Sequence, residues 1–188
     1  MTKRITALVM AVLMVVSLCA CGGKPEESKV EIESSVALLD SVWTTFAEEE
    51  KFPVMGGDFS AAVDGGAGAF NLTDKENAVA MLHIAEGDIA LVSEAATIIH
   101  AMNANTFTAA AYRLAEGTDG EAFVTSLKDS IKATQWMCGF PDTLIIYTVA
   151  ENYVVAAFGN AEAIENFKTK LATVYGESAT LNVEESLA

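Results

Sequence analysis

The sequence predicts an α+β fold in which two N-terminal helices precede a two-layer sandwich, with helices covering one four-stranded antiparallel sheet. One reason is that short apolar runs of strand length alternate with longer segments of helical period. The other is that the order strand, strand, helix occurs twice between about residues 88 and 175, as an approximate repeat of a ββα unit. Strands joined by short turns pair antiparallel, and helices bury their apolar stripes against a sheet face.

The first element is expected to be a helix over residues 35–49, because its apolar residues recur at helical spacing. These residues are Val36, Leu39, Trp43 and Phe46. Residues 51–72 follow as a long glycine-rich connection, which is either functional or mobile. Alternating apolar residues ahead of Asp64-Gly65-Gly66 predict a small hairpin within this connection.

Two capping boxes mark the starts of the next two helices. In this motif a Thr hydroxyl and a Glu carboxylate bind backbone amides that the first helical turn leaves free. Thr73–Glu76 predicts a helix over residues 74–85, and Thr118–Glu121 opens a third helix. The apolar stripe of the third helix is expected to consist of Phe123, Leu127, Ile131 and Trp136.

Four segments supply the strands of the predicted sheet. Residues 89–99 and 106–115 are rich in β-branched and small residues, and they are joined around Asn103. Residues 144–149 and 153–158 are apolar runs separated by a three-residue turn, which predicts a hairpin. Each pair is followed by a helix, so the four strands belong to the two ββα units.

The last helix is expected to begin after Asn160, whose side chain can cap the free backbone amides. Its stripe consists of Ile164, Phe167, Leu171 and Val174. Residues 177–188 are expected to be a loose tail, so that one domain extends over residues 35–176.

The first 20 residues have the features of a secretory signal. Lys3-Arg4 precedes an uncharged run that is too short to span a bilayer comfortably. The run ends in Leu18-Cys19-Ala20-Cys21-Gly22-Gly23, which resembles the lipobox of bacterial lipoproteins. The resemblance implies cleavage after Ala20 and transfer of a diacylglyceryl group to the sulfur of Cys21. An ordinary cleaved signal with an incidental cysteine is the alternative.

Lipidation of Cys21 would hold the protein at the cell membrane, on its extracytoplasmic face. Two or more acyl chains, such as palmitate, make an attachment persistent, so no transmembrane helix is needed. Residues 21–34 are polar and contain few apolar residues, which predicts a flexible tether between the anchor and the domain.

The charge of the chain excludes some partners. The net charge is −15, and no basic cluster follows Arg4, so nucleic acid is not an expected partner. Of three cysteines, Cys19 leaves with the signal and Cys21 is lipidated, which leaves Cys138 without a partner for an intrachain disulfide.

No catalytic motif is recognisable, so the chain is not expected to be an enzyme, and no cofactor or metal is expected. His83 and His100 lie in apolar stretches without metal-ligand spacing, and they are interpreted as core or rim residues. Cys138 has no cationic or histidine neighbour in the sequence and is interpreted as a buried apolar residue.

The glycine-rich connection contains the only candidates for a ligand or partner site. They are Asp58, Phe59, Asp64 and Phe70. Exposed aromatic residues in a loop mark partner surfaces, whereas solvated acids and aromatic residues that complete the core explain the same pattern. The acids around Asp74 and the run Glu48–Glu50 show no regular calcium-loop spacing.

Several strings resemble a domain family of unknown function found in small lipoproteins of Gram-positive anaerobic bacteria. They are Ala101-Met102-Asn103, the helix from Phe123 to Ile131, and Tyr153–Phe158 running into residues 160–171. The resemblance covers about residues 88–175, and it implies localisation and fold but no activity.

Three functional hypotheses follow. The leading one is a membrane-anchored, non-enzymatic binding or protein-interaction module whose partner is an envelope protein. The alternative is an accessory or ligand-binding subunit of an envelope transport system. The third is an envelope enzyme that uses acidic residues, which requires two carboxylates held across a cleft.

Overall fold

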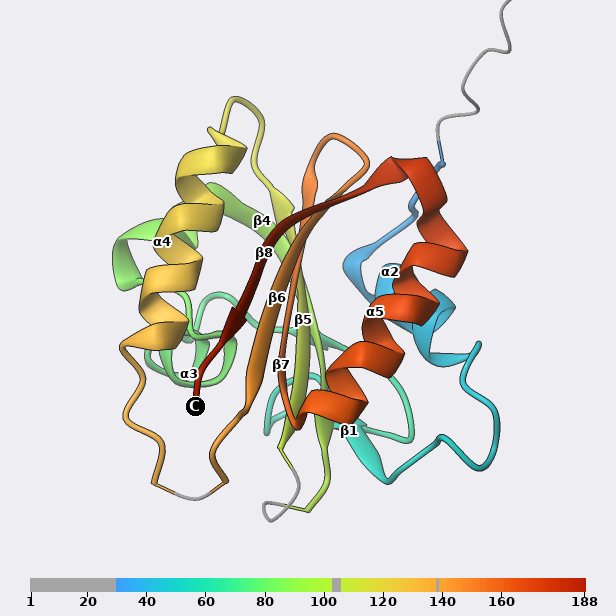
Figure 1. Cartoon of the computed structure of the whole chain (residues 1–188). Helices are drawn as coiled ribbons and strands as arrows, with labels where there is room; N and C mark the ends of the chain where they lie inside the picture. Colours follow the sequence, from blue (N-terminus) through green and yellow to red (C-terminus); the bar gives the residue numbers. More distant parts are fainter. Residues whose placement is uncertain (1–29, 103–105, 138) are drawn as a thin grey trace, which may run out of the picture.

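A computed structural model describes the chain over residues 30–102, 106–137 and 139–188. The described residues form one antiparallel sheet with helices on both faces (Figure 1). No helix within these ranges is long and apolar enough to cross a membrane. Several predicted features lie outside the described residues: the signal peptide, Ala20, Cys21, the tether up to residue 29, Asn103 and Cys138.

Eight strands form the sheet, in the order β2-β1-β4-β5-β7-β6-β8, and β3 also pairs with β4. All neighbouring strands are antiparallel. The strands are β1 (Val54–Gly56), β2 (Val63–Asp64), β3 (Gly68–Phe70), β4 (Val92–His100), β5 (Phe107–Leu114), β6 (Thr143–Val149), β7 (Tyr153–Gly159) and β8 (Ala179–Ser186).

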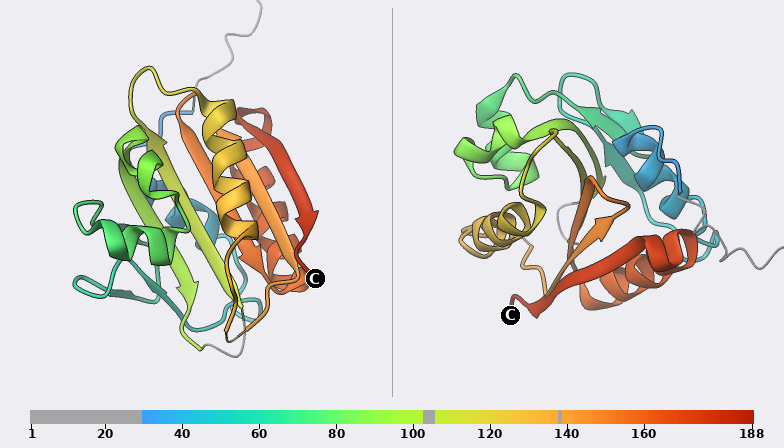
Figure 2. Two further views of the ribbon diagram at one scale, coloured as in Figure 1. Left: turned by 90° about the vertical axis from the view of Figure 1, so that its left-hand side faces the viewer. Right: turned by 90° about the horizontal axis from the view of Figure 1, so that it is seen from above.

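The α-helices lie in pairs on opposite faces of the sheet (Figure 2). They are α2 (Ser35–Trp43), α3 (Lys75–Leu82), α4 (Gly120–Lys132) and α5 (Ala161–Tyr175), with short 3₁₀ helices η2 (Glu86–Leu91) and η3 (Gly176–Ser178). Leu39 of α2 and Phe167 of α5 belong to one buried cluster. Leu82 of α3 and Leu127 of α4 belong to a second cluster. The molecule therefore has three layers.

The predicted two-layer sandwich with four strands is wrong, although the α+β class and the antiparallel pairing are found. Two connections explain the third layer. Helix α4 joins β5 to β6, which are parallel to each other with β7 between them, and α5 joins β7 to β8 across β6. Both cross toward the same edge of the sheet, but they start from strands of opposite direction. Because such crossovers keep one hand, their helices must lie on opposite faces.

The central strands have the composition that two covered faces require. In β5, Ala109 and Ala111 face the cluster of α2 and α5, whereas Ala110 and Tyr112 face the cluster of α3 and α4. Every residue of β7 is buried. A strand covered on both sides has a continuous apolar sequence instead of an alternating one. The alanines leave room for helices to approach the sheet closely from both sides.

The glycine-rich connection is part of the sheet. It forms β1, β2 and β3. A hairpin does form within it, from β1 and β2, but its turn precedes Val63 and does not lie at Asp64-Gly65-Gly66, where the sequence predicted it. The backbones of β1 and β3 lie in contact, because a Cβ atom on Gly56 would lie 2.2 Å from the amide nitrogen of Gly68. Only glycine permits this approach, so the glycines here are structural.

Other element boundaries also differ from the predictions. The first helix ends at Trp43 and not near residue 49, and the expected loose tail forms η3 and strand β8. Neither capping box forms, since Asp74 and Asp119 cap the helices in place of the preceding threonines. Asn160 caps α5 as predicted.

Candidate functional site

The first described residues enter the domain at one end of the sheet, next to the turn between β6 and β7. The Tyr153 hydroxyl donates a hydrogen bond to the carbonyl of Ile32 at 3.3 Å. The Ser35 amide donates to Oε1 of Glu94 on β4 at 2.5 Å. These contacts attach the segment before α2 to two strands of the sheet. We call this end of the molecule the entry end.

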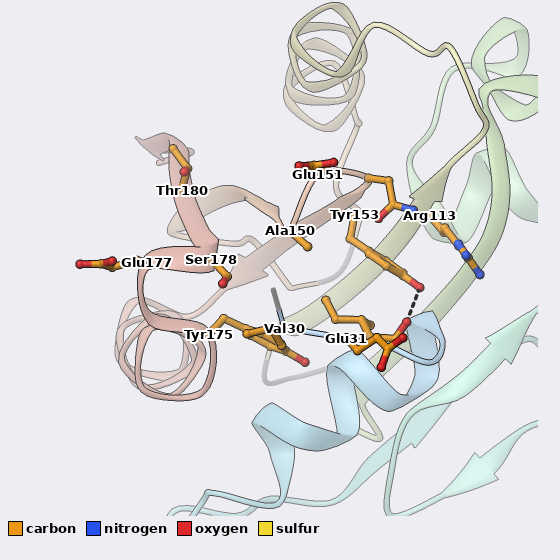
Figure 3. A pocket seen from close by; sticks show the side chains of 12 residues that line it. Val30, Glu31, Arg113, Ala150, Glu151, Tyr153, Tyr175, Glu177, Ser178 and Thr180 are labelled. Carbon is orange, nitrogen blue, oxygen red and sulfur yellow. Dashed lines mark hydrogen bonds between the residues drawn. The ribbon is translucent and has the colours of Figure 1, made fainter. Parts of the chain in front are cut away.

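A hollow of about 730 Å³ lies at the entry end (Figure 3). The Arg113 guanidinium lies 5.8 Å from the centre of the Tyr153 ring, and one of its nitrogens is 3.8 Å from Oε2 of Glu94. The Tyr175 hydroxyl donates to the carbonyl of Leu38 at 3.1 Å. Burial raises the pKa of both tyrosines, so they remain neutral hydrogen-bond donors.

The carboxylates that line this hollow are relevant to the hypothesis of an envelope enzyme with acidic catalytic residues. Glu31, Glu151 and Glu177 line it, and the side chain of Glu177 points away from the other two (Figure 3). In the part of the chain that the structure describes, no three His, Cys, Asp or Glu residues are grouped so as to hold a metal ion. The geometry therefore offers an acidic surface around one arginine.

The four candidate residues of the glycine-rich connection do not converge on one site. Asp58 is only 4% exposed, and its carboxylate accepts hydrogen bonds from the Ser60 side chain and from three backbone amides. The Ser60 bond is the main reason that the pKa of Asp58 is lowered. Asp58 thus shapes a turn, and Phe70 is buried in the core. Phe59, 78% exposed, and Asp64 lie on the surface at the β1–β2 hairpin.

Glu48, Glu50 and Asp74 also have structural partners. Glu50 pairs with Lys170 of α5 at 2.7 Å, and this hydrogen bond is the main cause of its lowered pKa. Glu48 pairs with Lys51 at 2.6 Å. The Asp74 side chain accepts the amide hydrogen of Asn77 at the start of α3. These contacts account for the acids without a ligand.

The most exposed apolar side chains outside the hairpin lie at the end of the sheet opposite Val30. Met102 follows β4 and is 53% exposed, while Met137 and Phe140, on the connection from α4 to β6, are 90% and 72% exposed. The Thr106 hydroxyl donates to the Phe140 carbonyl at 3.5 Å, which joins the two connections. Both lie at the foot of the sheet in Figure 1, far from the chain entry. We call Met102, Met137 and Phe140 the apolar end.

The apolar end lies next to aromatic rings that pack on the core. The ring of Trp136 lies 5.3 Å from that of Phe158 and 5.2 Å from that of His83. His83 adopts a left-handed backbone conformation at the end of α3, and its Nδ1 lies 3.1 Å from the Thr134 hydroxyl oxygen. Burial lowers the pKa of His83 to about 4. Both histidines are rim or core residues, in agreement with their interpretation from the sequence.

Sequence reasoning missed the apolar end. A signal was present, because Met137 and Phe140 lie next to Gly139 and Pro141, and glycine and proline this close together indicate a loop. Apolar side chains in such a loop either fold back onto the core or remain exposed. Trp136 packs on the core, whereas Met137 and Phe140 remain exposed.

Comparisons with known proteins add no family to this description. No protein-family model matches the chain, and no curated protein or solved structure matches it. The class that the fold defines is therefore an α+β domain with one eight-stranded antiparallel sheet between two layers of helices. The function has to be inferred from the chain itself.

Proposed function

We propose that the protein is a lipid-anchored module of the extracytoplasmic membrane face that binds an envelope protein through its apolar end. The observation that carries this proposal is the exposure of Met102, Met137 and Phe140, which follow β4 and precede β6 at the end of the sheet opposite the chain entry. Exposed apolar side chains that gather in one region of a surface mark interaction sites. An anchor at Cys21 would leave this end facing away from the membrane.

The geometry of the anchor supports this orientation. Strand β5 has 8 residues and separates the two ends of the sheet by about 25 Å. The chain between Cys21 and Val30 reaches at most about 30 Å even when fully extended. Such a tether keeps the entry end within about 30 Å of the membrane, which lets the apolar end reach proteins that stand next to the domain.

The charge at the entry end also supports the proposed orientation of the domain. The hollow beside Val30 is lined by three glutamates and one arginine. An acidic surface of this kind is repelled by anionic lipid headgroups. The domain therefore stands off the bilayer on its tether instead of lying flat on it, and the opposite end remains free for a partner.

The anchor is tested by membrane fractionation and mass spectrometry. The natural chain should sediment with membranes, and its N-terminal peptide should begin at Cys21 and carry acyl chains. The Cys21→Ala variant should lose both properties. A natural chain that is released in soluble form after cleavage, with an unmodified Cys21, would show that the signal is an ordinary one.

The binding surface is tested by photo-crosslinking in the native membrane. A photoreactive residue at position 137 or 140 should capture the same single envelope protein. The matched control places it at position 181, where Leu181 is an exposed apolar residue of β8. Capture of the same proteins from all three positions, or of none from the first two, would refute the proposal. A transporter subunit as the captured protein would make the domain an accessory of an uptake system.

A further inference from the structure

Both histidines of the chain lie beneath the apolar end. His100 is the last residue of β4, and its Nδ1 accepts a hydrogen bond from the backbone amide of Met102 at 3.0 Å. Its ring stacks on that of Phe52, with 4.8 Å between centroids and 7° between planes. His83 lies below the other connection, against Trp136. Each of the two apolar segments thus rests on one imidazole ring.

The bond to Met102 exists only while Nδ1 of His100 is unprotonated. A protonated Nδ1 carries a hydrogen and can only donate, so it would face the Met102 amide as a second donor. Phe52 covers the ring, and Val54 pairs with His100 across the β1–β4 ladder. None of these neighbours is charged or titratable. Burial lowers the pKa of His100 below its ordinary value, with no contribution from a charged group of the described residues.

We propose that binding at the apolar end is regulated by pH, because the position of Met102 depends on neutral His100. At neutral pH the hydrogen bond holds Met102 against the end of β4, at the same end of the sheet as Phe140. Mild acid protonates His100, breaks this bond and moves Met102. The inference rests on the proposed function, since a domain on the extracytoplasmic face experiences the pH of its surroundings.

The second histidine provides an internal contrast. Burial between aromatic rings lowers the pKa of His83 to about 4. The connection that carries Met137 and Phe140 therefore keeps its support in mild acid, when the turn of Met102 has already lost its hydrogen bond. The switch is expected to act on one of the two apolar segments and to leave the other in place.

Methionine methyl NMR on the full-length chain in detergent tests the conformational part. Between about pH 7.5 and about pH 5, the Met102 methyl signal should shift with one midpoint below about 6.5, whereas the Met137 signal should stay in place. The His100→Asn variant keeps an acceptor near the position of Nδ1 but does not titrate. Its Met102 signal should remain at the neutral-pH position throughout.

A Met102 signal that stays constant in the natural chain, or that moves equally in His100→Asn, would overturn the inference. A second readout covers the case in which this variant does not fold. In the natural chain, the ring protons of His100 and the methyl group of Met102 should share one midpoint. Different midpoints would show that another group moves Met102.

The crosslinking experiment separates this inference from the proposed function. Capture from position 137 should fall several-fold between about pH 7.5 and about pH 5, and His100→Asn should restore it. Equal capture at both pH values would refute regulation while leaving the binding function intact. A Met102 signal that titrates as expected without capture at either pH would refute the binding function.

Discussion

The two ends of the sheet differ in the side chains that they carry: one is polar and the other exposes apolar groups. At the entry end, Tyr153 and Glu94 bind the incoming chain by hydrogen bonds, and Arg113 forms an ion pair with Glu94. At the apolar end, exposed methionine and phenylalanine side chains lie next to partly buried aromatic rings and two neutral histidines. Polar contacts fix an attachment point, whereas exposed apolar groups are free to meet a partner. The difference separates attachment from recognition.

The largest expected effect is a loss of folding stability in acid, caused by His83 beneath the apolar end. His83 has a pKa near 4 in the folded protein, against about 6.5 when unfolded, so the unfolded chain binds more protons between these values. The free energy of unfolding should therefore fall as the pH drops from about 6.5 to about 4, by up to about 3 kcal/mol from this residue. Urea unfolding across this range measures it.

Carboxylates titrate over part of the same range, so the control for this prediction is His83→Asn. Asn tolerates the left-handed conformation of position 83 and does not titrate. The natural chain should lose more stability with acid than the variant. Equal losses in both would show that His83 does not contribute.

The next effect is a difference in stability between two substitutions, one of Trp136 beneath the apolar end and one of Met137 on its surface. Trp136→Ala removes a ring that packs on His83 and Phe158, and it should lower the free energy of unfolding by about 2 kcal/mol. Met137→Ala removes an exposed side chain and should change it by less than about 0.5 kcal/mol while reducing partner capture. Equal destabilisation by both would contradict the distinction between support and surface.

A smaller effect is expected at the entry end. Tyr153→Phe removes the hydroxyl that donates to Ile32, and it should lower the free energy of unfolding by about 1 kcal/mol. The control is Tyr147→Phe, since Tyr147 is similarly buried and has no hydrogen bond through its hydroxyl among the described residues. Both are measured by urea unfolding, and a control that loses as much as Tyr153→Phe would argue against the attachment.

The smallest effect concerns the ion pair of the entry end. The side chains of Arg113 and Glu94 are 43% and 32% exposed, so the pair is screened by solvent. Arg113→Met should lower the free energy of unfolding by about 0.5 kcal/mol at low salt and by less at high salt. Thermal unfolding at two salt concentrations checks this, and a large loss independent of salt would show that Arg113 acts through packing.

Much of the fold was predictable from local patterns. The strands over β4 to β7 and the helix after Asn160 occur where period and capping place them. The eighth strand was missed, although Leu181 and Val183 alternate with polar residues as strand residues do. The helix caps were misplaced by one residue, because an aspartate follows the threonine in both motifs and competes for the same backbone amides.

The candidate site was less predictable. Asp58 and Phe70 were selected by residue type, but the structure uses one to shape a turn and buries the other. The prediction that Phe59 belongs to a partner surface stays a prediction. The apolar end combines two connections that lie far apart in the sequence, Met102 on one and Phe140 on the other, and no local pattern relates them.

The sequence by itself determined the approximate positions of α4, α5 and the strands β4 to β7, the acidic surface, and the expectation of a lipid anchor at Cys21, because each depends on neighbouring residues. Only the tertiary structure decided that α4 and α5 lie on opposite faces and that the start of β5 lies next to Phe140 at one end of the sheet. The physical reason is that strand order and the hand of the crossovers arise from pairing between distant segments. That pairing places the ends of distant strands side by side.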